Sequence, residues 1–197
     1  QSLINTMDDS VIEKIKVRVE SFLKDYTRSH PECHYADLRL QWSETRWAVS
    51  EDGKSKGSGQ DVGCSLGIRV LAGQGLQAPG YWGGVLPYEK EDLAADLQAG
   101  LDHAYERAVA NSRRKVEASQ QWGEWSRAFQ NIPLAPAEIH RDKIPARYQI
   151  HPTAVSLQTI QQTTLDISKA VRDRSPQIRF NDVTAYTEAL RHLFVSS

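Results

Sequence analysis

A chain of 197 residues fits one domain of ordinary size and is long enough to bury a core without disulfides or metals. Its 24 basic and 25 acidic side chains leave a formal net charge of −1, so it lacks the basic excess typical of nucleic-acid-binding proteins. Two cysteines exclude a disulfide-dense secreted scaffold, and no apolar run approaches the roughly 18 residues that cross a bilayer. We therefore expect a cytoplasmic α+β protein with neither a membrane nor a nucleic acid as partner.

The first 30 residues predict one amphipathic helix. Ser10 and Glu13 form a capping box, in which each side chain accepts from a main-chain N–H that the helix leaves free. Apolar residues then recur at steps of three and four as far as Tyr26. We expect the helix to end near Arg28, because the residue before Pro31 disfavours helical geometry.

Alternating apolar and polar side chains then predict a mixed or antiparallel sheet of hairpin strands, packed with about three helices. The first two strands are 35–42 and 45–50, and Asp52-Gly53 marks the next turn. Residues 54–60 are rich in Gly, Ser and Lys, and they predict a loop. A third strand follows over 62–70.

The third predicted strand has two unlike faces. Its apolar face includes Cys64, which is therefore predicted to be a core residue and not a nucleophile. The other face carries little side chain, because it holds Gly63 and Gly67 beside Arg69. We expect either another backbone or a partner to approach this face, so these three are the candidate binding residues.

An edge strand and a long helix come next. Residues 76–82 predict a strand at the edge of the sheet, since Pro79 cannot donate a main-chain hydrogen bond. Residues 87–116 predict a helix with a stripe of leucines and alanines. Four basic residues lie near its predicted C-terminus, where they can interact favourably with the negative end of the helix dipole: Arg107, Arg113, Arg114 and Lys115.

Residues 119–152 are irregular and rich in tryptophan and proline. So long a connection without regular elements is uncommon in a compact domain. It either wraps around the surface or contacts a partner. For the second case, Trp122 and Trp125 are the candidate aromatic anchors.

The final part of the chain, 153–197, predicts a helix and two strands. The helix begins at Ser156 and stops before Pro176. The strands are 178–187 and 189–196, and the second reaches the C-terminus without a turn or cap. We therefore expect this chain to be a piece of a longer protein.

The sequence contains no constellation to which we assign a catalytic or metal-binding role. His30, Cys33 and His34 are close in sequence, but a structural zinc site needs four ligands and no second pair follows. Residues 57–63 are glycine-rich, yet they lead into a strand and not into the helix N-terminus that a phosphate loop uses. Four acidic residues are interpreted as solvated turn residues: Glu44, Glu51, Asp52 and Asp61.

Two of the strands resemble a known family. One reads Tyr-Ala-Asp-Leu-Arg-Leu-Gln over 35–41, and the other reads Asp-Val-Gly-Cys-Ser-Leu-Gly-Ile-Arg over 61–69. With the Ala/Leu helix that follows, they resemble the N-terminal domain of the TldD/PmbA family, the modulators of DNA gyrase (peptidase family U62). The resemblance covers residues 11–197 and is strongest over 35–110. The stretch from Gly63 to Arg69 departs from it, being longer than the family's Gly-x-Gly-x-Arg.

This resemblance implies a domain of a zinc metallopeptidase that degrades unfolded peptides inside an enclosed cavity. The family's zinc-binding His-Glu-x-x-x-His lies in the part after this region, and this chain does not contain it. We therefore expect no zinc, no other cofactor and no peptidase activity in this chain alone. The resemblance also implies a homo- or heterodimer with a related subunit, in which this domain helps to form the peptide cavity and contacts the partner.

The expected organisation is a single N-terminal domain over 1–197. It has a core over 8–118, the irregular connection over 119–152, and the elements of 153–197 that lead into an absent C-terminal domain. Two other functions stay open. One is a stand-alone protein-interaction module, and the other is a nucleic-acid-associated factor, against which the near-neutral charge argues.

Overall fold

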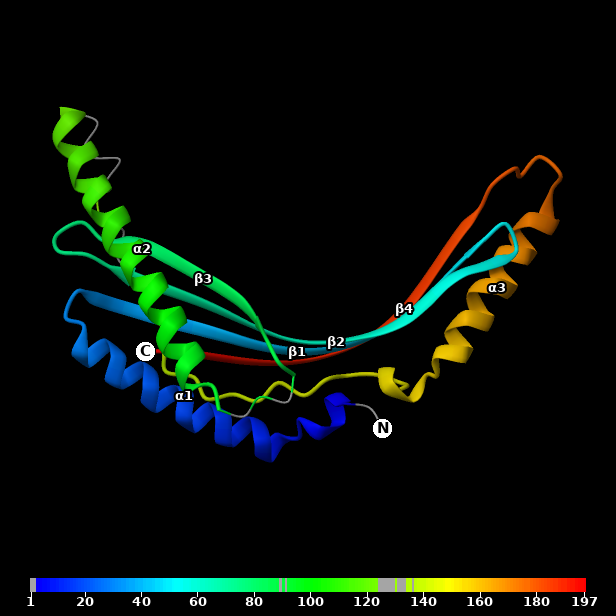
Figure 1. The fold of residues 1–197 in the computed structure, drawn as a ribbon, viewed down its shortest axis with the longest axis horizontal. Helices are drawn as coiled ribbons and strands as arrows, with labels where there is room; N and C mark the ends of the chain where they lie inside the picture. Colours follow the sequence, from blue (N-terminus) through cyan, green and yellow to red (C-terminus); the bar gives the residue numbers. More distant parts are fainter. Residues whose placement is uncertain (1–2, 89, 91, 124–129, 131–133, 136) are drawn as a thin grey trace. The chain divides into compact units, whose positions relative to one another are not determined.

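The computed structural model describes residues 3–88, 90, 92–123, 130, 134–135 and 137–197. Within them the strands form one sheet in the order β3-β2-β1-β4. The α+β class is therefore confirmed. The elements in chain order (Figure 1) are η1 (Leu3–Thr6), α1 (Asp9–Ser29), β1 (Cys33–Glu51), β2 (Lys54–Ala72), β3 (Ala78–Leu86), α2 (Ala94–Gln121), η3 (Pro152–Ala154), α3 (Leu157–Arg174) and β4 (Asp182–Ser196).

Neighbouring strands run antiparallel. β2 and β3 pair from Cys64 opposite Leu86 to Ala72 opposite Ala78. β1 and β2 are joined by the predicted Asp52-Gly53 turn, in which both residues have positive φ angles (48° and 74°). β4 runs against β1, since main-chain bonds join Asp52 to Asn181 at one end and Ala36 to Ser197 at the other.

The strands are longer than the sequence predicted. β1 is one strand of 19 residues, so the two predicted strands 35–42 and 45–50 are wrong as separate elements. Polar Ser43 and Glu44 suggested a break, but the alternation of buried side chains continues through Glu44. β4 is likewise one strand. Its predicted break at Glu188 is wrong, because that side chain is exposed and leaves the strand intact.

The predicted loop over 54–60 is also wrong, because these residues begin β2. Their glycines make room for an aromatic side chain of the neighbouring strand. The Trp47 ring would lie 3.0 Å from a Cβ added at Gly59 and 3.6 Å from one added at Gly57. The Trp47 Nε1–H also donates to Asp61 at 3.0 Å. Glycine here indicates close packing by a ring and not a flexible loop.

The three long helices correspond to the predicted ones. α3 begins as expected, with the Ser156 hydroxyl accepting from the Thr159 N–H at 3.0 Å. α2 begins and ends later than the predicted 87–116, so its basic residues are not in its last turn. Arg107 instead donates to the carbonyl oxygen of Tyr81 within the edge strand β3, and Lys115 donates to that of Gln77 just before the strand. Among the described residues, every helix is too short or too polar to span a bilayer.

The chain divides into two compact units. The second unit, residues 9–41, 64–144 and 192–197, has its core under α1 and α2 (Figure 1). α2 lies very close to β3, since a Cβ added at Gly80 would overlap the main chain at Ala104 and Ala108. The core side chains from the strands alternate along β1 and β2: Ala36, Leu38, Leu40, Cys64, Leu66, Ile68 and Val70. Cys64 is thus a core residue, as predicted.

The first unit, residues 1–8, 42–63 and 145–191, has a more polar contact between helix and sheet. α3 lies along the β1–β2 hairpin (Figure 1). The buried hydroxyls of Ser50 and Thr164 are 3.0 Å apart, and the Gly53 N–H donates to Ser168 at 2.8 Å. Ser168 in turn donates to Asn181. These hydrogen bonds attach α3 to the hairpin.

The close approach of α2 to β3 gives a stability prediction. Gly80→Ala should lower the free energy of unfolding by about 1–3 kcal/mol, because its new methyl group would press on the α2 main chain. Gly67→Ala is the matched control, since a Cβ there meets nothing within 4 Å. It should leave stability unchanged or raise it by up to about 1 kcal/mol. Urea unfolding of both variants checks this, and equal midpoints would contradict the packing described.

Candidate functional site

Residues of the two family-like strands meet on one side of the second unit's sheet. The Arg69 Nε donates to Asp37 Oδ2 at 2.8 Å, and its Nη2 bonds the same oxygen. Asp37 is 7% exposed, whereas Arg69 is about half exposed. The Arg69 guanidinium also lies 5.7 Å from the Tyr35 ring centre. The predicted binding residue Arg69 therefore has an internal anionic partner.

Two members of this cluster, Tyr35 and Arg69, have raised pKa values. Burial raises the pKa of Tyr35, and the neighbouring Asp37 carboxylate adds to the rise while Arg69 opposes it. The same carboxylate raises the pKa of Arg69. The Tyr35 hydroxyl thus stays protonated and Arg69 stays charged. Neither of these two side chains is therefore a base that takes up a proton at neutral pH.

A shallow hollow lies beside the cluster on the same side of the sheet. Gly67 of β2 stands directly opposite Gly83 of β3, and Ser65 opposite Val85 is the next pair on this side. The hollow is lined by eight residues of the second unit: Arg39, Gln41, Ser65, Leu66, Gly67, Gly83, Gly84 and Val85. We call it the glycine hollow.

The other predicted binding residues lie elsewhere. Gly63 belongs to the first unit, where a Cβ would meet only Ser43 Oγ at 3.5 Å. Trp122 follows the last turn of α2 and is more than half exposed. Trp125 lies outside the described residues. In the segment between α2 and η3, Lys143 forms an ion pair with Asp9 of α1.

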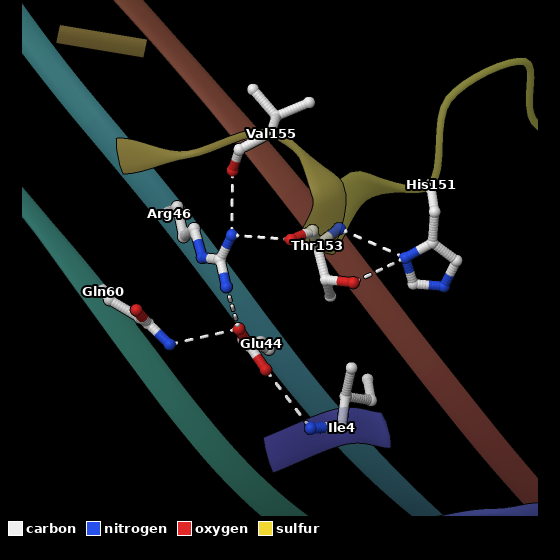
Figure 2. Close-up of polar contacts among 7 residues, drawn as sticks. All are labelled: Ile4, Glu44, Arg46, Gln60, His151, Thr153 and Val155. Atoms are coloured by element: carbon white, nitrogen blue, oxygen red, sulfur yellow. Dashed lines mark hydrogen bonds and ion pairs between the residues drawn. The ribbon is translucent and has the colours of Figure 1, made fainter. Parts of the chain in front are cut away.

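Sequence reasoning missed a buried ionic cluster in the first unit, which Figure 2 shows. Glu44 is 3% exposed, so its interpretation as a solvated turn residue is wrong. Its carboxylate accepts from Arg46 at 2.9 Å, from Gln60 at 3.0 Å and from the Ile4 N–H at 3.2 Å. Three donors, from β1, β2 and η1, thus meet at one carboxylate, which is the arrangement that a buried charge requires.

The second guanidinium nitrogen of Arg46 extends this cluster. It donates to the carbonyl oxygens of Thr153 and Val155 at 2.9 and 2.8 Å (Figure 2). The His151 ring accepts from the Thr153 N–H at 3.2 Å and caps η3. The Glu44–Arg46 pair therefore connects η1, β1, β2 and η3. No pattern in the sequence signals it, because its partners are up to 109 residues apart.

The remaining acidic turn residues are bonded as well. Asp52 accepts from the Asn181 N–H at 2.9 Å, and Asp61 accepts from Trp47. Glu51 pairs with Lys56 at 2.6 Å. These contacts stabilise the hairpin and leave no pair of carboxylates arranged for acid–base work.

The sequence cluster His30, Cys33 and His34 is separated by its contacts. His30 stacks on Tyr26 with ring centres 3.9 Å apart, and the His34 Nε2 lies 2.9 Å from the Gly73 oxygen. Cys33 is buried, and burial raises the pKa of its thiol. In the described part of the chain, no three His, Cys, Asp or Glu side chains gather where they could hold a metal ion.

The thiols are poor nucleophiles in this environment. Burial raises the pKa of Cys64 to about 11 and raises that of Cys33 too, so both stay protonated at neutral pH. The geometry of the described residues thus fits binding better than covalent chemistry.

No family model matches the sequence, and no curated protein sequence is significantly similar to it. TldE from Thermococcus kodakarensis matches 88% of this chain with a TM-score of 0.54 and 11% identity. A candidate modulator of a DNA gyrase from Thermotoga maritima matches 94% of this chain, with a TM-score of 0.47, 12% identity and 35% of its own length covered.

The likeness to TldE shows a shared fold, which is the fold that the family resemblance predicted. The chain spans about a third of the length of TldE, since the match covers 34% of that protein.

The buried ionic cluster gives a second stability prediction. Glu44→Gln should lower the free energy of unfolding by about 3 kcal/mol, because it leaves the Arg46 charge buried beside a neutral group. Glu51→Gln is the control, since the partner of Glu51 is more than half exposed and screened by water. It should change stability far less. Chemical denaturation measures both, and an equal loss in the two variants would contradict the special role of Glu44.

The raised pKa values of three tyrosines predict that the folded chain loses stability in alkali. Burial is the first cause that raises the pKa of Tyr26, Tyr35 and Tyr105, and Asp102 adds to it at Tyr26. Above about pH 10 the unfolded chain releases these protons while the folded chain retains them, so stability must fall as pH rises.

Tyr26→Phe tests this dependence. Phenylalanine has no proton to release, so the variant should lose less stability than the parent between neutral and alkaline pH. Tyr81→Phe is the matched control at an exposed tyrosine, and Tyr26→Phe should reduce the dependence more than it does. Unfolding by urea at a series of pH values, followed by tryptophan fluorescence, measures the slope. A parent protein whose stability is flat through this range would contradict the prediction.

Proposed function

We propose that this chain is a non-catalytic domain of a TldD/PmbA-like zinc metallopeptidase. In this role it helps to form the cavity in which unfolded peptides are cleaved, and it contributes contacts to a dimer of like or related subunits. The fold that it shares with TldE over 88% of its length carries the proposal. The Asp37–Arg69 pair adds support, because it joins the two strands on which the family resemblance rests.

The chain's own chemistry fits a supporting role. It contains no His-Glu-x-x-x-His sequence, and its two thiols are protonated and buried. In our proposal, zinc and the water that it activates belong to another part of the whole protein. The side of the sheet with Asp37, Arg69 and the glycine hollow would contribute binding groups to a peptide cavity.

The second candidate function is a stand-alone protein-interaction module. The observation in its favour is the half-exposed Trp122 after α2, since exposed aromatic side chains often anchor interfaces.

One experiment separates the two candidates. The gene is read beyond the codon for Ser197 and the complete protein is expressed with zinc. Our proposal expects a second domain and cleavage of an unfolded protein such as reduced, carboxymethylated lactalbumin, which a chelator stops. Residues 1–197 alone should show no cleavage. If the second domain lacks His-Glu-x-x-x-His, cleavage should appear only after the related subunit is added. A reading frame that stops near Ser197 would contradict the proposal and favour the module.

A further inference from the structure

The glycines of β2 and β3 separate into those that packing explains and those that it does not. A side chain at Gly80 would overlap α2, and one at Gly84 would press on the Trp82 ring. At Gly67 a Cβ meets nothing within 4 Å, and at Gly83 it meets only Leu66 O at an ordinary 3.8 Å. Neither Gly67 nor Gly83 has a positive φ angle. The fold therefore leaves room for a side chain at both positions.

These two residues form one cross-strand pair. Gly67 is directly opposite Gly83, so their missing side chains leave a single bare patch of main chain, the floor of the glycine hollow. Glycine weakens the interior of a strand. A place where a sequence departs from local preference without a packing reason is where a binding function is expected.

One wall of the hollow carries an arginine that forms no ion pair with the residues that the structure describes. Arg39 is exposed, and its guanidinium lies 5.9 Å from the Phe194 ring centre. Among the described residues no carboxylate pairs with Arg39, whereas Arg69 on the same side of the sheet is bound to Asp37. Val85 completes the opposite wall and is 84% exposed. The hollow thus combines an apolar wall with one cation, Arg39, that has no ion-pair partner among the described residues.

Under the hollow, the main chains of β2 and β3 are already paired with each other. β2 and β3 pair along the whole stretch from 64–72 to 78–86, so the floor cannot accept an added strand. Recognition must then come from side chains of the ligand. An aromatic ring can lie flat over bare glycine backbone, as it does when aromatic residues cover strand glycines. A guanidinium offers two parallel N–H donors to a carboxylate.

The geometry points to the glycine hollow as a binding site for an acidic peptide. The peptide places an aromatic side chain over Gly67 and Gly83 and a neighbouring carboxylate at Arg39. A phosphate or nucleotide fits less well, because one arginine supplies too little positive charge in a chain of net charge −1. This inference rests on the proposed function where it treats the peptide as a substrate, but the binding itself is measured without proteolysis.

Two variants remove the two halves of the site. Gly67→Leu places a large side chain in the hollow, at a position where a Cβ meets nothing within 4 Å. Arg39→Gln removes the free cation and keeps much of the side chain's length. Arg113→Gln is the matched control, since it removes an exposed arginine on α2, away from the hollow. Thermal unfolding should show that all three variants stay folded.

The probe is a fluorescein-labelled hexapeptide with a central Phe-Asp and capped ends, and fluorescence anisotropy on the 197-residue chain reads its binding. We expect saturable binding in the micromolar to millimolar range, weakened about tenfold or more by Gly67→Leu and by Arg39→Gln. Replacing Phe by Ala or Asp by Asn in the probe should weaken binding to a similar extent. Arg113→Gln should bind as the parent does.

Three outcomes would overturn the inference: no saturable binding by the parent, equal binding by Gly67→Leu, or equal binding of the probe without Phe. The last would mean simple charge attraction to Arg39. The outcomes for the proposed function are distinct from these. A complete protein that cleaves peptides at the same rate with and without Gly67→Leu, while neither binds the probe, refutes the hollow and leaves the proposed function standing.

Discussion

Burial of Glu44 is the constraint on which the first unit depends. A carboxylate in the interior is tolerated only where donors surround it, and here Arg46, Gln60 and the Ile4 N–H supply them. Because the charge is satisfied, β1 continues through its polar middle as one strand of 19 residues. The same Arg46 holds η3 through two carbonyl oxygens, so one ion pair ties together segments that are far apart in the chain.

The two sides of the sheet in the second unit differ in chemistry. One side is apolar and lies under α1 and α2, and α2 approaches β3 so closely that only glycine fits at position 80. Side chains of α2 also bond the carbonyl oxygens of Gln77, Pro79 and Tyr81, which protects the edge of the sheet. The other side carries the Asp37–Arg69 pair and the glycine hollow. The binding site that we propose therefore lies on the side that α1 and α2 leave uncovered.

The likeness to TldE extends over most of this chain but only a third of that protein. A shared fold does not carry an activity, since function depends on particular sites. Its two thiols are buried and protonated, and its second unit has a shallow hollow lined by glycines and an exposed arginine. These features support our proposal of a domain that holds or guides a ligand while another part of the protein carries out the catalytic step.

The sequence by itself determined the local structure: the three helices from their apolar spacing and Ser156 cap, the Asp52-Gly53 turn, and the buried side of β2 including Cys64. These features depend on residues within a few positions of one another. It could not show that β1, β2 and β4 are continuous, that Glu44 is buried or that Asp37 meets Arg69. Those outcomes were decided by the tertiary structure, because a polar or glycine residue continues a strand only when a distant segment satisfies or covers it.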